Sequence, residues 1–533
     1  MRKTKLLLAA IVLAALLIRL WISWQDISVL VEKILLDDSL YVISVARNIA
    51  LGNGLTYNGV DPTNGFQPLW GFMLVPVFWL TKDPNMAINF ILTISSVIDV
   101  LTVIVIFKLT KKLFNDKIAL MAAAFYGLNP FTIFQNLCGI ELVLYIFLLM
   151  SSLLYYFSHE SLKRRNVIIL GVLLGLTMLA RLDGVFLTLV IFIDMLWKDR
   201  KKLSSGIKKI LVITVIAAVL LAPWFLWCYF TFGNFMQSSA IAKYNMGHGI
   251  FPFFDLKQPK TITDTLMMVG ENFVRSGGAI ANQLGIVDFS FNPITIALAL
   301  VLAATLIASL KNLGKVKIYV LFSVLIILFY NLYLWGVQIR YLTPLIPLFI
   351  MLICDGFYTI VTRMKKSDLL VAAFFTLLML VIIVNGVKQW DNGYFPWQKQ
   401  IYQDALWLKQ NTSPSESIGC FSAGIPIYFS ERRVVNLDGV VNFGAILALR
   451  NHSVIDYMEK ENITLWYDTV YFNKTVTQSY ASGNKIDILD QNIWQDFLGD
   501  GKERLQLIDQ KEEVYKHLLG FDMLIVFFKA RVL

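Results

Sequence analysis

Apolar runs of roughly 14 to 24 residues recur eleven times in the first 387 residues, and a helix needs roughly 20 apolar residues to cross a bilayer. The chain is 57% hydrophobic, above the roughly 45 to 50% apolar content that is typical of soluble domains. The sequence therefore predicts an α-helical polytopic membrane protein. Its expected spans are residues 5–24, 86–109, 118–135, 139–157, 166–180, 184–197, 208–230, 292–310, 316–335, 341–362 and 367–387.

Lysine and arginine gather in short clusters between these runs. If every run crosses the membrane once, all of the clusters fall on one side, and loops rich in these residues face the cytoplasm. We therefore expect a multi-pass protein of the plasma membrane with a cytoplasmic N-terminus. The net charge of +10 follows from this topology and does not indicate a nucleic-acid partner. The clusters are MRKTK, KLTKKLFNDK, LKRR, KDRKK, KNLGKVK and RMKK.

One further apolar run, Leu69–Leu80, is expected not to cross the membrane. It has only about a dozen residues and two prolines nearby, which is typical of an interfacial or re-entrant segment. Counting it as a crossing would invert every later loop and send the basic clusters outward.

The composition changes near residue 387, after which charged and amide residues become frequent. We expect residues 1–387 to form the membrane domain, similar to a GT-C fold as argued below, and residues 388–533 to form a small extracytoplasmic α/β domain. In the tail, β-rich runs such as TLWYDTVYF alternate with helical patterns such as YQDALWLKQ. Two long loops, 25–85 and 231–291, are expected on the same outer face as this domain.

Two adjacent carboxylates, Asp37 and Asp38, open a short helical pattern in the first outer loop, and the glycines of GNG end it. This helix is too short to span and is expected along the outer membrane surface. One carboxylate could remove the proton of an acceptor hydroxyl while the other orients or binds, because neighbouring carboxylates raise each other's pKa. The alternative is that the pair only caps the helix.

Other polar residues of the outer face are candidates for substrate contacts. An arginine at the start of the tenth span is suited to a lipid phosphate, although a structural arginine can also snorkel there. Ionisable residues between two short spans can equally mark a turn, and a lone histidine is more often structural than catalytic. The predicted donor contacts are Arg340, Tyr341, Arg181, Asp183, Lys243 and His248, and the predicted acceptor or loop contacts are Glu141, Asn64, Gln67 and Trp70.

Four stretches carry a family resemblance: DDSLYVISVARNIALGNGLTYNGVDPTNGFQPLW, ARLDG, RYLTPLIPL and AGIPIYFSERRVVNLDGVVN. In these stretches the chain resembles the polytopic glycosyltransferases of the GT-C superfamily. The likeness is to prokaryotic relatives of protein O-mannosyltransferases, to the lipid A aminoarabinose transferase and to mycobacterial terminal arabinofuranosyltransferases. The chain lacks the WWDYG signature of oligosaccharyltransferases and any MIR-type insertion, which disfavours block transfer and the eukaryotic branch.

The resemblance implies a sugar donor linked to a polyprenyl phosphate, an acidic catalytic residue in the first outer loop, and transfer with inversion. By matching position, the catalytic acid falls on Asp37 or Asp38, and the arginine of the late RY motif falls on Arg340. The expected partners are this lipid-linked sugar, a glycan, lipid or protein acceptor, and the surrounding membrane lipid.

The sequence leaves two other functions open. A transporter or flippase of lipid-linked sugars would also have many helices, but transporters usually show paired halves and a site near the midplane. A membrane receptor that binds glycans through its tail would not need Asp37 and Asp38. The acidic pair could hold a divalent metal, but no further ligand spacing supports one, and the four cysteines have no zinc-site spacing, so no cofactor is assigned.

Overall fold

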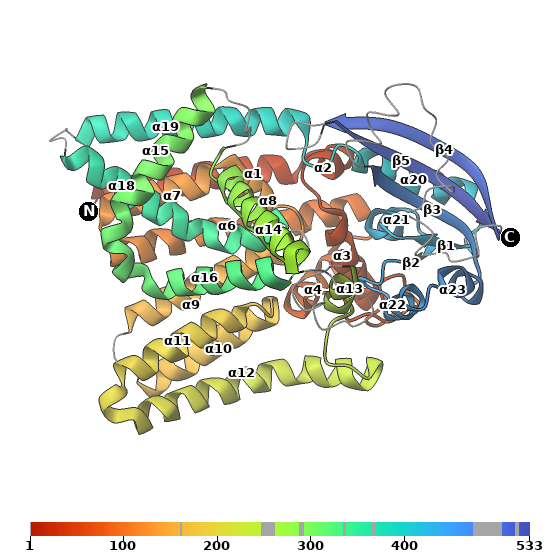
Figure 1. The fold of residues 1–533 in the computed structure, drawn as a ribbon, viewed down its shortest axis with the longest axis horizontal. Helices are drawn as coiled ribbons and strands as arrows, with labels where there is room; N and C mark the ends of the chain where they lie inside the picture. Colours follow the sequence, from red (N-terminus) through yellow and green to blue (C-terminus); the bar gives the residue numbers. More distant parts are fainter. Residues whose placement is uncertain are drawn as a thin grey trace.

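Among the described residues, helices form the part of the protein up to residue 392, and a five-stranded sheet with four helices forms the tail (Figure 1). The computed structural model describes residues 2–159, 163–246, 262–286, 293–333, 337–363, 368–472, 504–516 and 522–533. The long helices are α1 (Arg2–Ser23), α6 (Pro84–Leu113), α7 (Asp116–Leu128), α8 (Pro130–Asn136), α9 (Leu142–Ser158), α10 (Arg164–Ala180), α11 (Gly184–Lys198), α12 (Leu203–Phe232), α15 (Pro293–Ser309), α16 (Lys317–Tyr333), α18 (Ile346–Arg363) and α19 (Asp368–Asn392).

Each span expected from the sequence corresponds to one of these helices or, for 118–135, to the consecutive helices α7 and α8. Six helical stretches of the described residues are long and apolar enough to cross a membrane, and α7 with α8, bent by 61°, would add a seventh. The polytopic membrane architecture is thus confirmed. Helices α9, α10 and α11 have only 17, 17 and 15 residues, so the number of eleven crossings stays a prediction.

The segments between the helices of the expected spans contain further helices, most of them short. The run Leu69–Leu80 folds as two of them, with 7 and 4 residues, and it is not among the stretches long enough to span. Pro68 stands in the first turn of the first, and Pro76 precedes the second. The loop helices are α2 (Ile27–Lys33), α3 (Asp37–Ala50), α4 (Pro68–Leu74), α5 (Val77–Leu80), α13 (Ser238–Met246), α14 (Ile262–Gln283) and α17 (Ile339–Leu342), with 3₁₀ turns η1 (Arg200–Lys202), η3 (Leu310–Val316) and η4 (Thr343–Leu345).

An arginine–aspartate pair lies in the interior of the helical bundle. Arg19 of α1 pairs with Asp99 of α6 at 2.6 Å, and both side chains are fully buried. The second Asp99 oxygen accepts hydrogen bonds from Tyr126 (2.9 Å) and Asn136 (2.8 Å). A charge at membrane depth is tolerated when it faces the bundle interior and is paired in this way.

The tail sheet has the strand order β2-β1-β3-β5-β4, with parallel pairs around β1 and antiparallel pairs around β5. A small C-terminal domain with both helices and strands is therefore present, as expected. The charged edge strand β4 was not expected from its sequence LQLIDQKEEVYK. The tail elements are α20 (Gln398–Asn411), β1 (Ser417–Cys420), α21 (Gly424–Phe429), β2 (Arg433–Asn436), α22 (Phe443–Arg450), α23 (Val454–Lys460), β3 (Ile463–Phe472), β4 (Leu505–Lys516) and β5 (Asp522–Val532).

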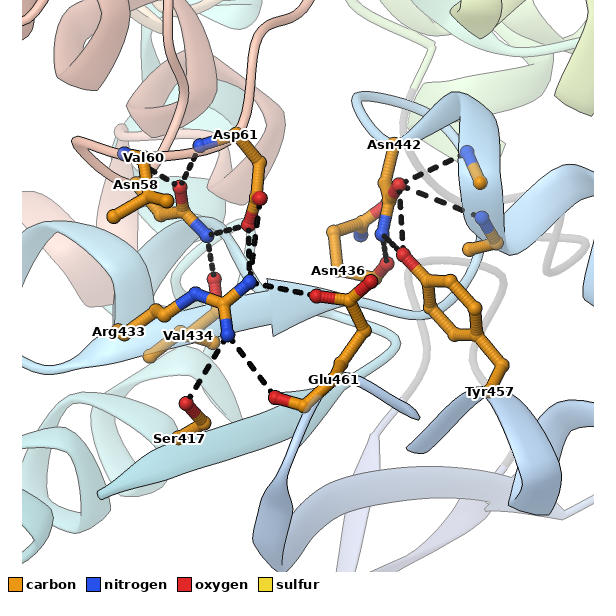
Figure 2. Close-up of polar contacts among 12 residues, drawn as sticks. Asn58, Val60, Asp61, Ser417, Arg433, Val434, Asn436, Asn442, Tyr457 and Glu461 are labelled. Atoms are coloured by element: carbon orange, nitrogen blue, oxygen red, sulfur yellow. Dashed lines mark hydrogen bonds and ion pairs between the residues drawn. The ribbon is translucent and has the colours of Figure 1, made fainter. Parts of the chain in front are cut away.

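Ion pairs and hydrogen bonds join the loop of residues 25–85, which the sequence predicts on the outer face, to the tail. Figure 2 shows the guanidinium of Arg433 between Asp61 of the loop (3.1 Å) and Glu461 of the tail (2.7 Å). Asn58 of the loop also donates to the backbone oxygen of Val434, at 3.0 Å. The loop therefore connects the bundle to the tail, and α3 lies between the two (Figure 1).

Candidate active site

Helix α3 brings the acidic pair to the contact between bundle and tail. The residue before it, Leu36, is extended, and its backbone N–H donates to the Cys138 oxygen at 3.1 Å. The Asp37 N–H donates to the side chain of Gln398 at 2.9 Å, and Gln398 in turn donates to Leu35 at 2.7 Å. The alternative that the acidic pair only caps this helix is wrong, because the start of α3 has no side-chain cap. Most of α3 is buried within the protein, and its expected position along the membrane surface stays a prediction.

Asp37 faces the tail. Its carboxylate accepts hydrogen bonds from the backbone N–H groups of Ile425 (2.7 Å) and Gly424 (3.2 Å) at the start of α21. Tyr41, one helical turn later, accepts a hydrogen bond from the Ala423 N–H at 3.0 Å. Burial, followed by the negative charge of Asp38, raises the pKa of Asp37 to about 7 despite these hydrogen bonds. Asp37 therefore joins α3 to the tail.

Asp38 faces the bundle instead. Its Oδ2 lies 2.6 Å from a guanidinium nitrogen of Arg340, and its side chain is 39% exposed. Burial tends to raise the pKa of Asp38, but the positive charges of Arg340 and Lys243 outweigh it and bring the pKa below its ordinary value. The considerable exposure of this side chain also limits the effect of burial. Asp38 is therefore ionised at neutral pH and accessible.

Arg340 belongs to a chain of aromatic and charged contacts. Its guanidinium lies 5.5 Å from the ring centre of Tyr341, which stacks on Tyr330 at 4.6 Å. The Tyr330 hydroxyl donates to Asp183 at 2.6 Å and accepts from Arg181 at 3.0 Å. The structure thus brings together Arg340, Tyr341, Arg181 and Asp183, four of the predicted donor contacts.

Arg181 differs from Arg340 because its partners already neutralise its charge. It pairs with Glu141 at 2.6 Å and with Asp183 at 3.3 Å, and all three side chains are nearly buried. Two carboxylates for one guanidinium leave no positive charge for a phosphate. The geometry therefore favours a structural role for Arg181, Asp183 and Glu141.

Three predicted acceptor or loop contacts have internal partners. Asn64 accepts a hydrogen bond from the Ser238 N–H at 2.9 Å, which positions the start of α13. Gln67 donates to Gln237 at 3.4 Å, just before the same helix. Trp70 is fully buried and donates to the Gly139 oxygen at 3.0 Å. These residues hold the loops in place.

Helix α13 carries Lys243, whose charge acts on both Asp38 and Asp438. The helix packs on the tail, where its Ile241 and Ala242 cluster with Ile446 of α22. His248, the remaining predicted donor contact, lies outside the described residues.

Asp438 is a third carboxylate of the site that the sequence analysis missed. It lies between β2 and α22, and its Oδ1 accepts a hydrogen bond from the Val440 N–H at 2.8 Å. Burial raises its pKa to about 7, and the charge of Asp38 adds to the effect while that of Lys243 opposes it. One signal could have identified it: Asp438 follows a strand of a parallel pair, and ligands of such sheets bind beyond the carboxyl ends of the strands.

The site therefore combines three carboxylates, Asp37, Asp38 and Asp438, with two cations, Arg340 and Lys243. An accessible carboxylate beside an arginine can accept a proton next to a bound phosphate. Within the described ranges, no group of three or more His, Cys, Asp or Glu side chains has an arrangement that could hold a metal ion.

Comparisons with known proteins support the expected resemblance. A family model described as dolichyl-phosphate-mannose-protein mannosyltransferase matches residues 68–227, and a domain of unknown function (DUF8728) matches residues 391–503. The first match begins 30 residues after Asp38 (68 − 38), so it does not include the acidic pair. No curated protein matches the chain by sequence.

Two solved structures are similar over most of the chain. The Archaeoglobus fulgidus oligosaccharyltransferase in its apo form has a TM-score of 0.53 and 16% identity, covering 86% of this chain and 69% of that one. ArnT from Cupriavidus metallidurans, bound to undecaprenyl phosphate, has a TM-score of 0.53 and 12% identity, covering 97% of both chains. At this identity the likeness concerns the fold, which the chain shares with these two proteins.

Proposed function

Starting from this GT-C fold, we propose that the chain is a membrane glycosyltransferase that moves a sugar from a polyprenyl-phosphate donor to an acceptor hydroxyl outside the cytoplasm, with inversion. The observation that carries the proposal is the Asp38–Arg340 pair, a proton acceptor 2.6 Å from a phosphate-binding cation. The undecaprenyl phosphate bound in the similar ArnT structure supports a donor of the same lipid class.

In this mechanism Arg340 binds the donor phosphate, which displaces Asp38 from the guanidinium. The freed carboxylate takes the acceptor's hydroxyl proton while the acceptor oxygen attacks C1 of the sugar from the side opposite the phosphate. The new glycosidic bond forms as the bond from C1 to the phosphate oxygen breaks, and polyprenyl phosphate leaves. Arg340 stabilises the charge that grows on the leaving phosphate, an effect worth about 3 to 4 kcal/mol for a well-placed donor.

Asp38 is the better candidate for the base than Asp37. Two backbone N–H groups of the tail already occupy the Asp37 carboxylate, which would have to give up these bonds to reach an acceptor. Asp38 has one oxygen on Arg340 and a side chain that is 39% exposed. Asp37 is thus a positioning residue, and Lys243 and Asp438 set the charge around the base.

The test uses the purified protein in lipid or detergent with radiolabelled polyprenyl-phosphate sugars and a panel of glycan, lipid and protein acceptors. We expect Asp38→Asn to lower the transfer rate by about 10²- to 10⁴-fold, the usual contribution of a general base. Asp37→Asn should lower it less than tenfold, and Asp26→Asn, which alters an exposed cap of the same loop, should leave it unchanged.

A larger loss in Asp37→Asn than in Asp38→Asn would move the base to Asp37. If no donor supports transfer while vesicles containing the protein translocate the lipid-linked sugar, the transferase proposal is wrong and a flippase replaces it.

A further inference from the structure

A cavity of about 280 Å³ lies where the end of α6, the start of α7, η3 and the end of α18 meet. The other end of α6 touches the tail, since the Tyr428 hydroxyl donates to the Pro84 oxygen at 2.8 Å. The 30 residues of α6 cover about 45 Å at 1.5 Å per residue, and Phe114 of the cavity wall follows directly. The cavity is therefore at the end of α6 opposite the tail, and far from the contact between bundle and tail where Asp38 lies.

The cavity wall carries three cations, Lys311, Lys315 and Arg363. The Lys315 ammonium lies 5.3 Å from the ring centre of Phe114, which holds it against the wall. The start of α7 contributes little, because the Asn115 side chain already accepts from its first free N–H groups. The positive charge thus comes from side chains of η3 and α18.

The same wall contains one carboxylate, that of Asp355. Asp355 is 3% exposed and accepts a hydrogen bond from Asn312 at 2.7 Å. Among the ion pairs of the described residues, none joins Asp355 to a lysine or arginine, although Lys311 and Lys315 line the same cavity. The charges of Lys315 and Lys311 act on Asp355 from beyond ion-pair distance, so a cation that enters the cavity could pair with this carboxylate directly.

We propose that this cavity binds the headgroup of a membrane phospholipid that contains both a phosphate and a primary amine, as phosphatidylethanolamine does. Lys311, Lys315 and Arg363 would bind the phosphate, as basic pockets between membrane helices bind lipid headgroups. The ammonium would pair with Asp355. A purely anionic headgroup would satisfy the cations but meet the negative charge of Asp355, and a choline headgroup has no N–H to donate to it.

The test measures lipid binding to the full-length protein by native mass spectrometry and by thermal stabilisation. Phosphatidylethanolamine, phosphatidylglycerol and phosphatidylcholine are compared at equal mole fraction, with inorganic phosphate as a fourth arm. We expect phosphatidylethanolamine to bind at least fivefold more tightly than the other lipids, and inorganic phosphate to have no effect. Neither readout depends on glycosyl transfer, so failure of the proposed function would leave this result unaffected.

Variants test which side chains bind the phosphate of the headgroup and which bind its ammonium. The double variant Lys311→Gln/Lys315→Gln should weaken phosphatidylethanolamine binding at least tenfold. Asp355→Asn should abolish the preference for phosphatidylethanolamine over phosphatidylglycerol. The matched control Lys201→Gln/Lys202→Gln removes two exposed charges of η1, outside the cavity. It should change neither the affinity for phosphatidylethanolamine nor the preference over phosphatidylglycerol.

Three results would overturn the proposal. They are phosphatidylglycerol binding to the wild type as tightly as phosphatidylethanolamine, binding of inorganic phosphate alone, and an equal loss of binding in the control variant. If a cavity variant does not fold, displacement of bound lipid from the wild type by glycerophosphoethanolamine but not by glycerophosphate decides the same question.

Discussion

Two arginine–aspartate pairs in this protein have the same nitrogen–oxygen distance but differ in how far they are exposed to solvent. Arg19–Asp99 and Arg340–Asp38 each measure 2.6 Å. The first is fully buried, and both Asp99 oxygens accept hydrogen bonds. The second has side chains that are 13% and 39% exposed. The distance alone does not separate a structural pair from a reactive one, whereas accessibility and the number of partners do.

The difference has a physical basis. A buried pair is stable only if its remaining hydrogen-bonding groups are satisfied, and once satisfied it has nothing left to offer a ligand. An accessible pair gains less from its mutual attraction, so a phosphate can separate it at a smaller cost. The Arg181–Glu141 pair, at 2.6 Å and nearly buried, resembles the first kind although it lies near Arg340.

The largest effect on stability is expected from breaking the interior pair. Asp99→Asn would leave Arg19 charged and unpaired in the bundle, which should cost about 3 to 5 kcal/mol of folding free energy. Thermal unfolding in detergent would measure the loss, and the transfer rate per folded molecule should be unchanged. The apolar double variant Arg19→Met/Asp99→Leu should recover most of the stability. A loss of activity without a loss of stability in Asp99→Asn would contradict the structural assignment.

Breaking the accessible pair should lower the transfer rate and leave the stability nearly unchanged. Arg340→Gln removes the cation that faces the donor phosphate and should lower the transfer rate about 10²- to 10³-fold, or about 2.7 to 4 kcal/mol. The melting temperature should change little because the pair is partly exposed. Arg340→Lys keeps the positive charge but lacks the planar guanidinium, which can donate two parallel hydrogen bonds to a phosphate. Its transfer rate should therefore lie between those of the wild type and Arg340→Gln. A melting temperature that falls as far as in Asp99→Asn would make Arg340 structural.

The contact between α3 and the tail can be tested at a glycine. A Cβ at Gly424 would clash with the Asp37 backbone oxygen, so Gly424→Ala must push α21 away from the acidic pair. We expect a stability loss of about 1 to 3 kcal/mol, as for other overpacked sites, together with a lower transfer rate. Gly277→Ala is the control, since a Cβ there meets nothing within 4 Å. Full activity in Gly424→Ala would show that the tail does not position the acids.

The sequence predicted those features that depend on local patterns. Apolar runs encode their own helices, and the glycines after α3 end it where expected, with Gly52 at a φ of 85°. It did not predict contacts that require docking of distant parts. Asp438 acts on Asp38 from 400 positions away (438 − 38), and the neutralisation of Arg181 depends on Glu141, 40 positions earlier. The strand before Asp438 marks this residue as a candidate, but a single sequence carries no local signal for the contact it makes or for that between Glu141 and Arg181.

The smallest effect expected is a pH dependence that separates the two aspartates of the pair. The pKa values of Asp37 and Asp438 are about 7 in the folded protein, above the roughly 3.9 of an unfolded aspartate. The folded state therefore binds more protons between pH 4 and 7, and its stability should fall as the pH rises from 6 to 8, by up to about 1.4 kcal/mol for each group. Asp37→Asn should remove its share of this dependence.

The transfer rate should follow a different course, because the pKa of Asp38 is lowered and the carboxylate stays ionised at pH 6. A base with a pKa of about 7 would be about 90% protonated at pH 6, so its rate would drop about tenfold between pH 8 and pH 6. We therefore expect the rate of the chemical step, measured in single turnovers, to vary less than threefold over this range. A tenfold fall on acidification that disappears in Asp37→Asn would assign the base to Asp37 and make Asp38 the partner that holds Arg340.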